Sequence, residues 1–314
     1  MEQFAAGKVL RSRYRLDRVL GRGAMGHVWE GTDVYLERPV AVKTVAAELL
    51  APADRRRTAL GRFEREAKTA ARLDHPNITT VYDAALTEDF CCLVMQLVDG
   101  TTLDNVIDCA DDGRLSTAAA VSVAAQLCSG LSAAHAAGLV HRDLKPQNVM
   151  VRASGLVKIL DFGLVKVLSD ADPQLTMTGE TVGNVAYASP ELLSGDRMLD
   201  GRSDLYAVGC LLHHMLTGRP PFDGPGPADL VTRHLTAPPP RFADDGVDAP
   251  AALQDLVHAL LAKRPEDRPG GAAEVYAALA PHLPAPDPAF ATRRMPPEDP
   301  RRPFLVPQAP VMPR

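Results

Sequence analysis

The chain has 314 residues, enough for one large domain or for two lobes that each bury a core. Its 46% hydrophobic and 23% charged residues are typical of a soluble globular protein, and its formal net charge of −5 gives no indication of nucleic-acid binding. The sequence contains no run of 18 or more apolar residues, so it predicts no membrane span.

The cysteine and histidine content points to an intracellular protein without a zinc site. The five cysteines are an odd number and include no C-x-x-C pair, and the N-terminus lacks an apolar signal core. These features predict reduced thiols and a cytoplasmic location. The pair His213 and His214 has no zinc-ligand spacing around it, so we expect core or surface histidines there.

The first third of the chain predicts a small β-rich lobe. Short runs rich in Val, Leu and aromatic residues are separated by Gly or Pro, which is typical of strands. These runs are residues 14–20, 27–34, 39–45, 78–86 and 90–98. Residues 54–73 predict one long helix that stops before the breaker cluster "DHPN". We therefore expect a five-stranded antiparallel sheet with one helix.

The following residues predict a mainly helical lobe. A long helix is expected after Ser116, as N-cap, and before Gly138, as a C-terminal stop. Further helices are expected at 203–218, 227–236, 250–263 and 271–280. With a connector near 96–101, this arrangement predicts a ligand cleft between the two lobes.

The expected domain boundaries follow from these elements. They are an N-terminal extension at 1–10, a β lobe at 11–96, a helical lobe at 97–282 and a tail at 283–314. The tail has ten prolines in 32 residues and is predicted to be disordered or polyproline-like. A solvated linker is the favoured interpretation, and a ligand for SH3-like or WW-like partners is the alternative.

A glycine-rich stretch, "GRGAMGHV", places Gly21, Gly23 and Gly26 directly after a predicted strand. Glycines at such a turn let backbone N–H groups approach phosphates closely. A strand rather than a helix follows, which disfavours a dinucleotide-binding fold. A plain hairpin turn remains the alternative at this point.

A lysine, Lys43, stands in the middle of the apolar run "VAVKTV". A lysine on an inward face is costly unless it is paired, so we expect a carboxylate partner on the long helix. Glu66 shares a helix face with Phe63 and Ala70, and Glu64 is a rival that periodicity alone does not exclude.

Three polar motifs follow in order: "HRDLKPQN" at 141–148, "DFG" at 161–163 and "SPE" at 189–191. Together with the glycine-rich stretch and "VAVK", they make the chain resemble the protein kinase superfamily over roughly residues 11–280. It looks most like bacterial serine/threonine kinases of the eukaryotic type. The resemblance implies a bilobal α+β fold with a small antiparallel β lobe and a larger helical lobe.

The resemblance also implies catalytic roles. Asp143 would orient the substrate hydroxyl and accept its proton, and Lys145 would neutralise charge on the moving phosphoryl group. Asn148 and Asp161 would hold Mg²⁺, for which Mn²⁺ could substitute. Lys43, held by Glu66 in preference to Glu64, would bind the α- and β-phosphates of ATP.

The remaining contacts implied with ATP form an apolar sandwich and a hinge. Adenine would lie against Val28, Ala41 and Met150, with Met95 at the gatekeeper position. The backbone of Gln96 and Val98 would bond the adenine edge. The full implied set is Leu20, Gly21, Gly23, Gly26, Val28, Ala41, Lys43, Glu66, Met95, Gln96, Val98 and Met150.

Six other residues receive structural roles from the same resemblance. His141 and Phe162 would pack, and His135 would satisfy the local backbone. Asp204 would anchor the catalytic loop. Glu191 and Arg268 would form a buried ion pair.

Regulation is expected in the loop between the second and third polar motifs. Thr176 and Thr178 stand where related bacterial kinases are phosphorylated, with Thr181 as the runner-up, and Arg142 would receive the phosphate. Asn184 stands where the family has a threonine, in "GNVAY", and predicts an active but submaximal kinase.

The predicted function is an ATP-dependent serine/threonine protein kinase that autophosphorylates this loop. Its expected partners are ATP, protein substrates and a second copy of the chain during autophosphorylation, without nucleic acid or a membrane span. The alternative is a pseudokinase that serves as a nucleotide-binding scaffold. That alternative is disfavoured because Lys43, Asp143 and Asp161 are all present.

Overall fold

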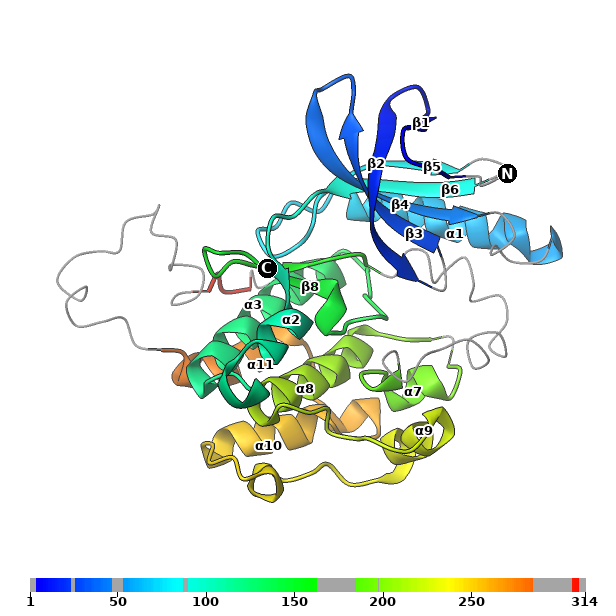
Figure 1. Ribbon diagram of the computed structural model, residues 1–314. Coiled ribbons are helices and arrows are strands. Elements are labelled where there is room, and N and C mark those ends of the chain that lie inside the picture. Colours follow the sequence, from blue (N-terminus) through cyan, green and yellow to red (C-terminus); the bar gives the residue numbers. More distant parts are fainter. Residues whose placement is uncertain are drawn as a thin grey trace. The chain divides into compact units, whose positions relative to one another are not determined.

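A computed structural model describes residues 4–23, 26–46, 53–86, 90–162, 185–196, 198–284 and 307–310 (Figure 1). The chain divides into two compact units. Among the described residues, unit 1 comprises those from 4 to 74 and from 79 to 99, and unit 2 comprises those from 75 to 78, from 100 to 162 and from 185 onward. The segment His75–Ile78 therefore belongs to unit 2, although it lies between two elements of unit 1 in the sequence.

Unit 1 is an antiparallel sheet accompanied by one long helix, α1. The strand order is β1-β2-β3-β4-β6-β5. The bounds are β1 Val9–Leu10, β2 Tyr14–Gly23, β3 Gly26–Asp33, β4 Arg38–Ala46, α1 Ala53–Ala70, β5 Val81–Leu86 and β6 Phe90–Gln96. The five predicted strands and the helix are confirmed. The additional strand, β1, has two residues, too few to show an alternating pattern.

One face of the unit 1 sheet is a hydrophobic core. Trp29 in β3 lies opposite Val42 in β4, which lies opposite Val94 in β6, and all three are buried. Directly opposed residues in antiparallel strands project from the same face, so these side chains pack together. Leu16 and Tyr14 of β2 complete this cluster. The residues that alternate with them project from the opposite face and are available for a site.

Unit 2 is mainly helical and contains a small sheet (Figure 1). Helix α3 packs against both α8 and α11, and α10 packs against α8. The helix bounds are α2 Leu103–Asp108, α3 Thr117–Ala136, α7 Pro190–Leu193, α8 Gly201–Thr217, α9 Pro227–Thr236, α10 Ala251–Leu260 and α11 Ala272–Leu279. The 3₁₀ turns are η2 Asp111–Gly113, η3 Pro146–Asn148, η4 Phe242–Asp245, η5 Pro265–Asp267 and η6 Ala280–His282.

The small sheet of unit 2 was not predicted. Its strands are β7 Thr101–Thr102, β8 Val149–Val151 and β9 Val157–Ile159, in the order β7-β8-β9. Strands of two or three residues are below the length at which periodicity identifies a strand. This sheet nonetheless positions the expected site, because β8 follows Asn148 and β9 precedes Asp161 directly.

The predicted ends of helix α3 are confirmed. The Ser116 hydroxyl accepts a hydrogen bond from the Ala119 N–H, and Gly138 has a φ of 77° just beyond the last turn. Helix α3 is also long and apolar enough to cross a membrane by length and composition alone. Its most apolar window is 72% buried inside the protein, as in the core helix of a globular domain.

A buried ion pair fixes α7 within unit 2, as predicted. The Arg268 guanidinium donates to both carboxylate oxygens of Glu191, at 2.7 and 2.8 Å, and the Arg268 side chain is fully buried. It also donates to the backbone carbonyls of Arg202, Ala262 and Lys263. This paired, fully bonded guanidinium ties α7 to the start of α8 and to the loop after α10.

Candidate active site

In unit 1, strand register brings four of the predicted nucleotide-binding residues onto one face of the sheet. Val28 lies opposite Lys43, and Ala41 lies opposite Met95. Ala41 and Lys43 are two residues apart on β4, so they point the same way. Val28, Ala41, Lys43 and Met95 therefore share the face opposite the Trp29 core. Three apolar side chains and one lysine on this face suit a ligand that has a flat ring and a negatively charged group.

The glycine-rich hairpin joins β2 to β3, with Gly21 opposite Val28 and Gly23 opposite Gly26. Gly26 has a φ of 136°, and a Cβ there would meet the Thr44 carbonyl oxygen, so the fold itself requires glycine. A Cβ on Gly21 would meet nothing within 4 Å. Because the described structure does not require glycine at position 21, the open space above it fits a ligand that approaches the backbone closely.

Helix α1 favours Glu66 over Glu64 as the carboxylate associated with Lys43. Glu66 lies half-buried on the face of α1 that carries the buried residues Phe63, Ala67 and Ala70. Glu64 is exposed and engaged at the surface by Lys68, at 2.6 Å one turn along the helix. Glu64, the alternative that periodicity left open, is therefore engaged in a surface ion pair with Lys68.

The remaining predicted unit 1 residues lie on β2 and at the end of β6. Leu20 is 42% exposed on β2, Met95 and Gln96 end β6, and Val98 follows half-buried. The Gln96 N–H already donates to the Thr80 carbonyl, at 2.9 Å. An adenine contact from Gln96 would therefore use its carbonyl oxygen, and the complementary donor would come from Val98.

In unit 2, a buried carboxylate holds the catalytic loop, as predicted. The two Asp204 oxygens accept hydrogen bonds from the His141 N–H, at 2.8 Å, and the Arg142 N–H, at 2.9 Å. Arg142 has a φ of 63°, a backbone conformation that costs energy in a residue other than glycine. The hydrogen bonds that Asp204 accepts stabilise this conformation directly before Asp143.

His135 has a different role from the one predicted. Its Nε2 lies 2.8 Å from Asp204 Oδ2, so it contacts the anchoring carboxylate rather than the local backbone. No local sequence pattern indicates this contact, because the two residues are 69 positions apart. Burial alone would raise the pKa of Asp204. The His135 hydrogen bond, with the charge of His135 and the His141 backbone N–H, instead holds that pKa below its usual value.

His141 is a buried residue with defined hydrogen bonds in addition to its predicted packing. Its ring lies 5.1 Å from the Phe162 ring, which supports the packing role of both residues. Its Nδ1 accepts from the Asp143 N–H, so its Nε2 carries the proton and donates to the Leu160 carbonyl, at 2.8 Å. The imidazole thus links the backbone of Asp143 to the segment that leads into Asp161.

The central cluster of unit 2 joins Asp143, Lys145 and Asn148. The Asn148 amide donates to the Asp143 backbone carbonyl, at 2.7 Å, and to Asp143 Oδ2, at 3.0 Å. The Lys145 ammonium lies 3.4 Å from the same Oδ2. One carboxylate oxygen of Asp143 is therefore oriented by an amide and a cation. The side chains of Lys145 and Asp143 are each less than a fifth exposed. Such a group can accept a proton from a hydroxyl while remaining fixed in space.

The oxygen ligands expected for a metal lie next to this cluster. Because the Asn148 NH₂ is committed to Asp143, its Oδ1 is the atom that can bind a cation. Asp161 follows β9 with a φ of 47°, and the Leu160 N–H donates to the Asn148 carbonyl at 2.8 Å, which couples the two segments. One carboxylate and one amide oxygen fit Mg²⁺, which keeps several waters and shares phosphate oxygens.

Other predicted residues are divided between described and undescribed parts of the chain. Met150 lies half-buried on β8, two residues after Asn148. Thr176, Thr178, Thr181 and Asn184 lie outside the described residues. Within the described residues, no group of three or more His, Cys, Asp and Glu side chains is placed to hold a metal ion.

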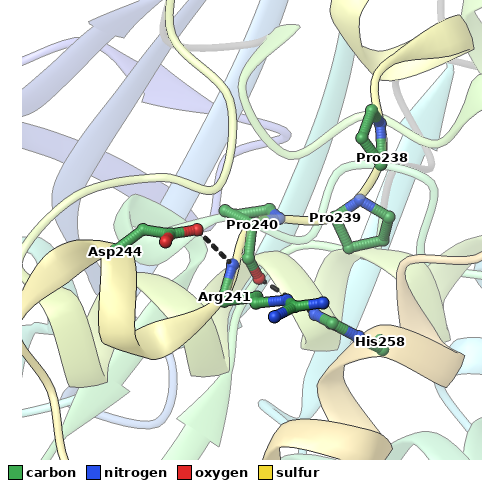
Figure 2. Close-up of a pocket in the computed structure, with 6 residues that line it drawn as sticks. All are labelled: Pro238, Pro239, Pro240, Arg241, Asp244 and His258. Carbon is green, nitrogen blue, oxygen red and sulfur yellow. Dashed lines mark hydrogen bonds between the residues drawn. The ribbon is translucent and has the colours of Figure 1, made fainter.

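A surface hollow of about 590 Å³ lies elsewhere in unit 2, on the connection between α9 and α10 (Figure 2). Figure 2 shows that three consecutive prolines form its wall, together with Arg241, Asp244 and His258. His258 Nε2 donates to the Pro240 carbonyl, and Asp244 accepts from the Arg241 N–H. The Asp244 carboxylate and the His258 imidazole are thus engaged in holding the loop, and none of the lining residues belongs to the predicted site.

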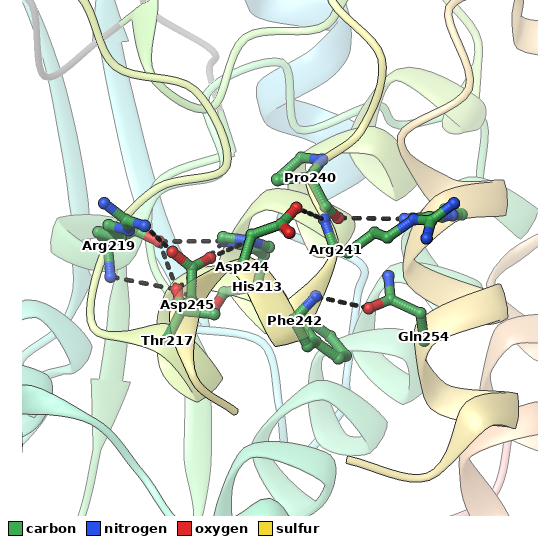
Figure 3. Close-up of polar contacts among 10 residues, drawn as sticks. His213, Thr217, Arg219, Pro240, Arg241, Phe242, Asp244, Asp245 and Gln254 are labelled. Carbon is green, nitrogen blue, oxygen red and sulfur yellow. Dashed lines mark hydrogen bonds and ion pairs between the residues drawn. The ribbon is translucent and has the colours of Figure 1, made fainter. Parts of the chain in front are cut away.

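The neighbouring contacts explain how this connection is fixed (Figure 3). The buried Asp245 carboxylate lies 3.3 Å from His213 Nε2 of α8 and also pairs with Arg219. Gln254 of α10 accepts from the Phe242 N–H, at 2.6 Å. These contacts hold η4 between α8 and α10. We therefore interpret His213 as a core histidine with a structural partner, as the sequence predicted.

Comparison with known proteins agrees with this geometry. Residues 14–279 match the family model of the protein kinase domain, and the chain therefore belongs to that family. The fold class predicted from the sequence is confirmed. Protein kinase domains use ATP and a divalent cation and act on protein substrates.

The relatives of the chain include named bacterial kinases. It is 38% identical over 276 residues to serine/threonine-protein kinase PknB of Mycobacterium tuberculosis, covering 86% of this chain and 43% of that protein. It is 36% identical over 279 residues to a probable serine/threonine-protein kinase of Corynebacterium efficiens, covering 86% and 41%. The chain thus spans less than half the length of these curated relatives.

Solved structures give the same family. The crystal structure of the Mycobacterium tuberculosis PknI kinase domain is similar, with a TM-score of 0.70 and 28% sequence identity. The alignment covers 89% of this chain and 100% of that one. The likeness therefore extends over the whole of that kinase domain.

Proposed function

We propose that this chain is an ATP-dependent serine/threonine protein kinase. The observation that carries the proposal is the oriented Asp143 carboxylate, with Asn148 and Lys145 on one of its oxygens and Asp204 holding the preceding backbone. Its relatives named as serine/threonine-protein kinases support the same substrate class.

The unit 1 residues would bind the nucleotide. Val28, Ala41 and Met95 would contact the base, and Lys43 would neutralise phosphate charge. The backbone at Gly21 and Gly23 would approach the phosphates closely. Each of these contacts positions a charged, flexible molecule, and positioning is a large part of what phosphoryl transfer requires.

The unit 2 residues would act on the reacting groups. Asp143 would align the hydroxyl of the protein substrate and accept its proton, and Lys145 would stabilise the charge that develops on the transferred group. Asn148 and Asp161 would hold Mg²⁺, which neutralises phosphate charge when bound. The side chains of Asp143, Lys145 and Asn148 are already oriented by their mutual contacts, so little reorganisation of them is needed during the reaction.

Two further proposals concern the setting of the enzyme. We propose a cytoplasmic location, supported by the five unpaired cysteines, four of which are buried as thiols. We also propose that two copies associate transiently so that one phosphorylates the loop of the other. The positions of Thr176 and Thr178, in the loop where the family resemblance implies phosphorylation, support this proposal.

A phosphoamino acid analysis tests the proposed function. The purified chain is incubated with γ-labelled ATP, Mg²⁺ and a general protein substrate, and the labelled protein is hydrolysed. We expect label on phosphoserine and phosphothreonine, with none on phosphotyrosine. Lys43→Met is the control, and it should lower incorporation by at least about a hundredfold. ATP binding without any incorporation would favour the pseudokinase alternative.

A further inference from the structure

The Pro-rich tail contains a four-residue segment, "PQAP", whose placement the structure describes. Pro307 is buried, Gln308 and Ala309 are exposed, and Pro310 is half-buried. The Tyr276 hydroxyl of helix α11 donates to the Pro307 carbonyl oxygen, at 2.8 Å. A contact between residues 31 positions apart shows that this part of the tail lies against the surface of unit 2.

The burial pattern of this segment matches a polyproline II helix. That helix has three residues per turn, so positions 307 and 310 share one face while 308 and 309 point away. The observed order of buried, exposed, exposed and half-buried is the pattern that such a helix gives when one edge contacts a surface. Two prolines separated by two residues also form the P-x-x-P arrangement that favours this conformation.

Helix α11 provides a suitable surface. Its residues Ala272, Val275 and Leu279 are buried, and α11 packs against α3. Tyr276 lies beside this buried stripe and is partly exposed. Burial raises the pKa of the Tyr276 phenol, so the group keeps its proton and acts as a hydrogen-bond donor near neutral pH.

We propose that α11 carries a docking site for a P-x-x-P segment, and that Pro307–Pro310 of the same chain occupies it. Recognition rests on chemistry that polyproline-binding surfaces share: an aromatic side chain contacts the proline and donates a hydrogen bond to a backbone carbonyl. The prolines of this segment are therefore ligands of the chain's own helical unit. An external proline-binding partner would have to displace them first.

Covalent connection makes a small site of this kind sufficient. One hydrogen bond and one buried proline ring give weak binding between separate molecules. Here 22 residues, 285–306, join the segment to η6 and α11, which makes docking an intramolecular step. Effective concentrations for such connections are on the order of millimolar, so even a weak site is substantially filled.

The mobility of a probe on the exposed Gln308 tests this proposal in the full chain. Gln308→Cys is labelled with a nitroxide in a Cys109→Ser background, because Cys109 is the exposed cysteine and the other four are buried. We expect an immobilised component in the electron paramagnetic resonance spectrum. Tyr276→Phe, which removes one hydroxyl, should lower the ratio of immobilised to mobile label by about two- to tenfold.

Matched variants separate docking from general effects. Pro307→Ala/Pro310→Ala should release the label as Tyr276→Phe does, because it removes the P-x-x-P pattern. Pro303→Ala and the exposed-tyrosine variant Tyr35→Phe should not change the spectrum. Thermal unfolding of each protein checks that the kinase units stay folded.

Two further arms identify the occupant. A synthetic peptide of residues 302–314 in excess should displace the segment and mobilise the label, whereas the peptide with its prolines changed to alanine should not. The immobilised fraction should stay constant over about a hundredfold dilution if docking is within one chain. A label that is equally mobile in the parent and in Tyr276→Phe would overturn the proposal. A fraction that falls on dilution would replace it with docking between two copies.

Discussion

The side-chain amide of Asn148 donates to two acceptors of a single residue, the backbone carbonyl and the carboxylate of Asp143, at 2.7 and 3.0 Å. This fixes the orientation of the Asp143 carboxylate and leaves the amide oxygen of Asn148 for a cation. Asn148 would therefore both position Asp143 and bind the metal, and these two functions can be separated by mutation.

Asn148→Asp and Asn148→Ala should differ in their metal dependence. Asp keeps an oxygen ligand but loses the donor to Asp143, whereas Ala loses both. We expect kcat to fall by about ten- to a hundredfold in both variants, since a hydrogen bond to a charged group is lost. The Mg²⁺ concentration for half-maximal rate should rise at least about tenfold in Ala alone. Equal Mg²⁺ dependence in the two variants would contradict the ligand role.

The threonines at 176 and 178 should be phosphorylated in the active protein. A phosphothreonine adds about −1.5 to −2 charges, which could pair with Arg142 and order the loop. We expect mass spectrometry to find phosphate on at least one of them, and Thr176→Ala/Thr178→Ala to lower activity. An active preparation without phosphate at either position would reject this regulation, and phosphate at Thr181 would relocate it.

Asn184→Thr should increase the rate. Asn184 stands where the family has a threonine that bridges the catalytic aspartate and lysine, and the longer planar amide is expected to fit less well. One weakened hydrogen bond corresponds to about a two- to tenfold change in kcat. Steady-state kinetics on proteins matched for loop phosphorylation measure this. A variant no faster than the parent would indicate that the site is adapted to asparagine.

Glu191→Ala should strongly destabilise unit 2. It would leave the fully buried Arg268 guanidinium without its carboxylate, which costs about 3–5 kcal/mol when a buried pair is broken. Urea unfolding monitored by circular dichroism gives the change in the free energy of unfolding. Glu64→Ala is the matched control, because the Glu64–Lys68 pair is exposed and should contribute little. Similar effects of the two substitutions would contradict the structural role of the buried pair.

Much of unit 1 could be predicted from the sequence because its strands are long and its core residues alternate. Runs such as "PVAVKTV" and "FCCLVMQLV" gave both the strands and the face that carries Lys43. Periodicity did not separate Glu66 from Glu64, because both residues lie on the helix. The family resemblance favoured Glu66, and the burial and partners of the two residues agree with it.

The parts that escaped prediction depend on short elements or on distant contacts. The strands β7, β8 and β9 have two or three residues each, which is too short for a periodic signal. The bond between His135 and Asp204 joins positions far apart in the sequence. The docking of Pro307 on Tyr276 is of the same kind, and the tail's composition gave no indication of which prolines would be buried.

Phosphoryl transfer by the parent chain and by Asp143→Asn is the most direct test of the proposed kinase. Both proteins are incubated with γ-labelled ATP, Mg²⁺ and a protein substrate, and their thermal unfolding is compared to show that each is folded. The proposal predicts incorporation on serine and threonine by the parent and a kcat at least about a hundredfold lower for Asp143→Asn. Normal autophosphorylation by Asp143→Asn would contradict the role assigned to this carboxylate.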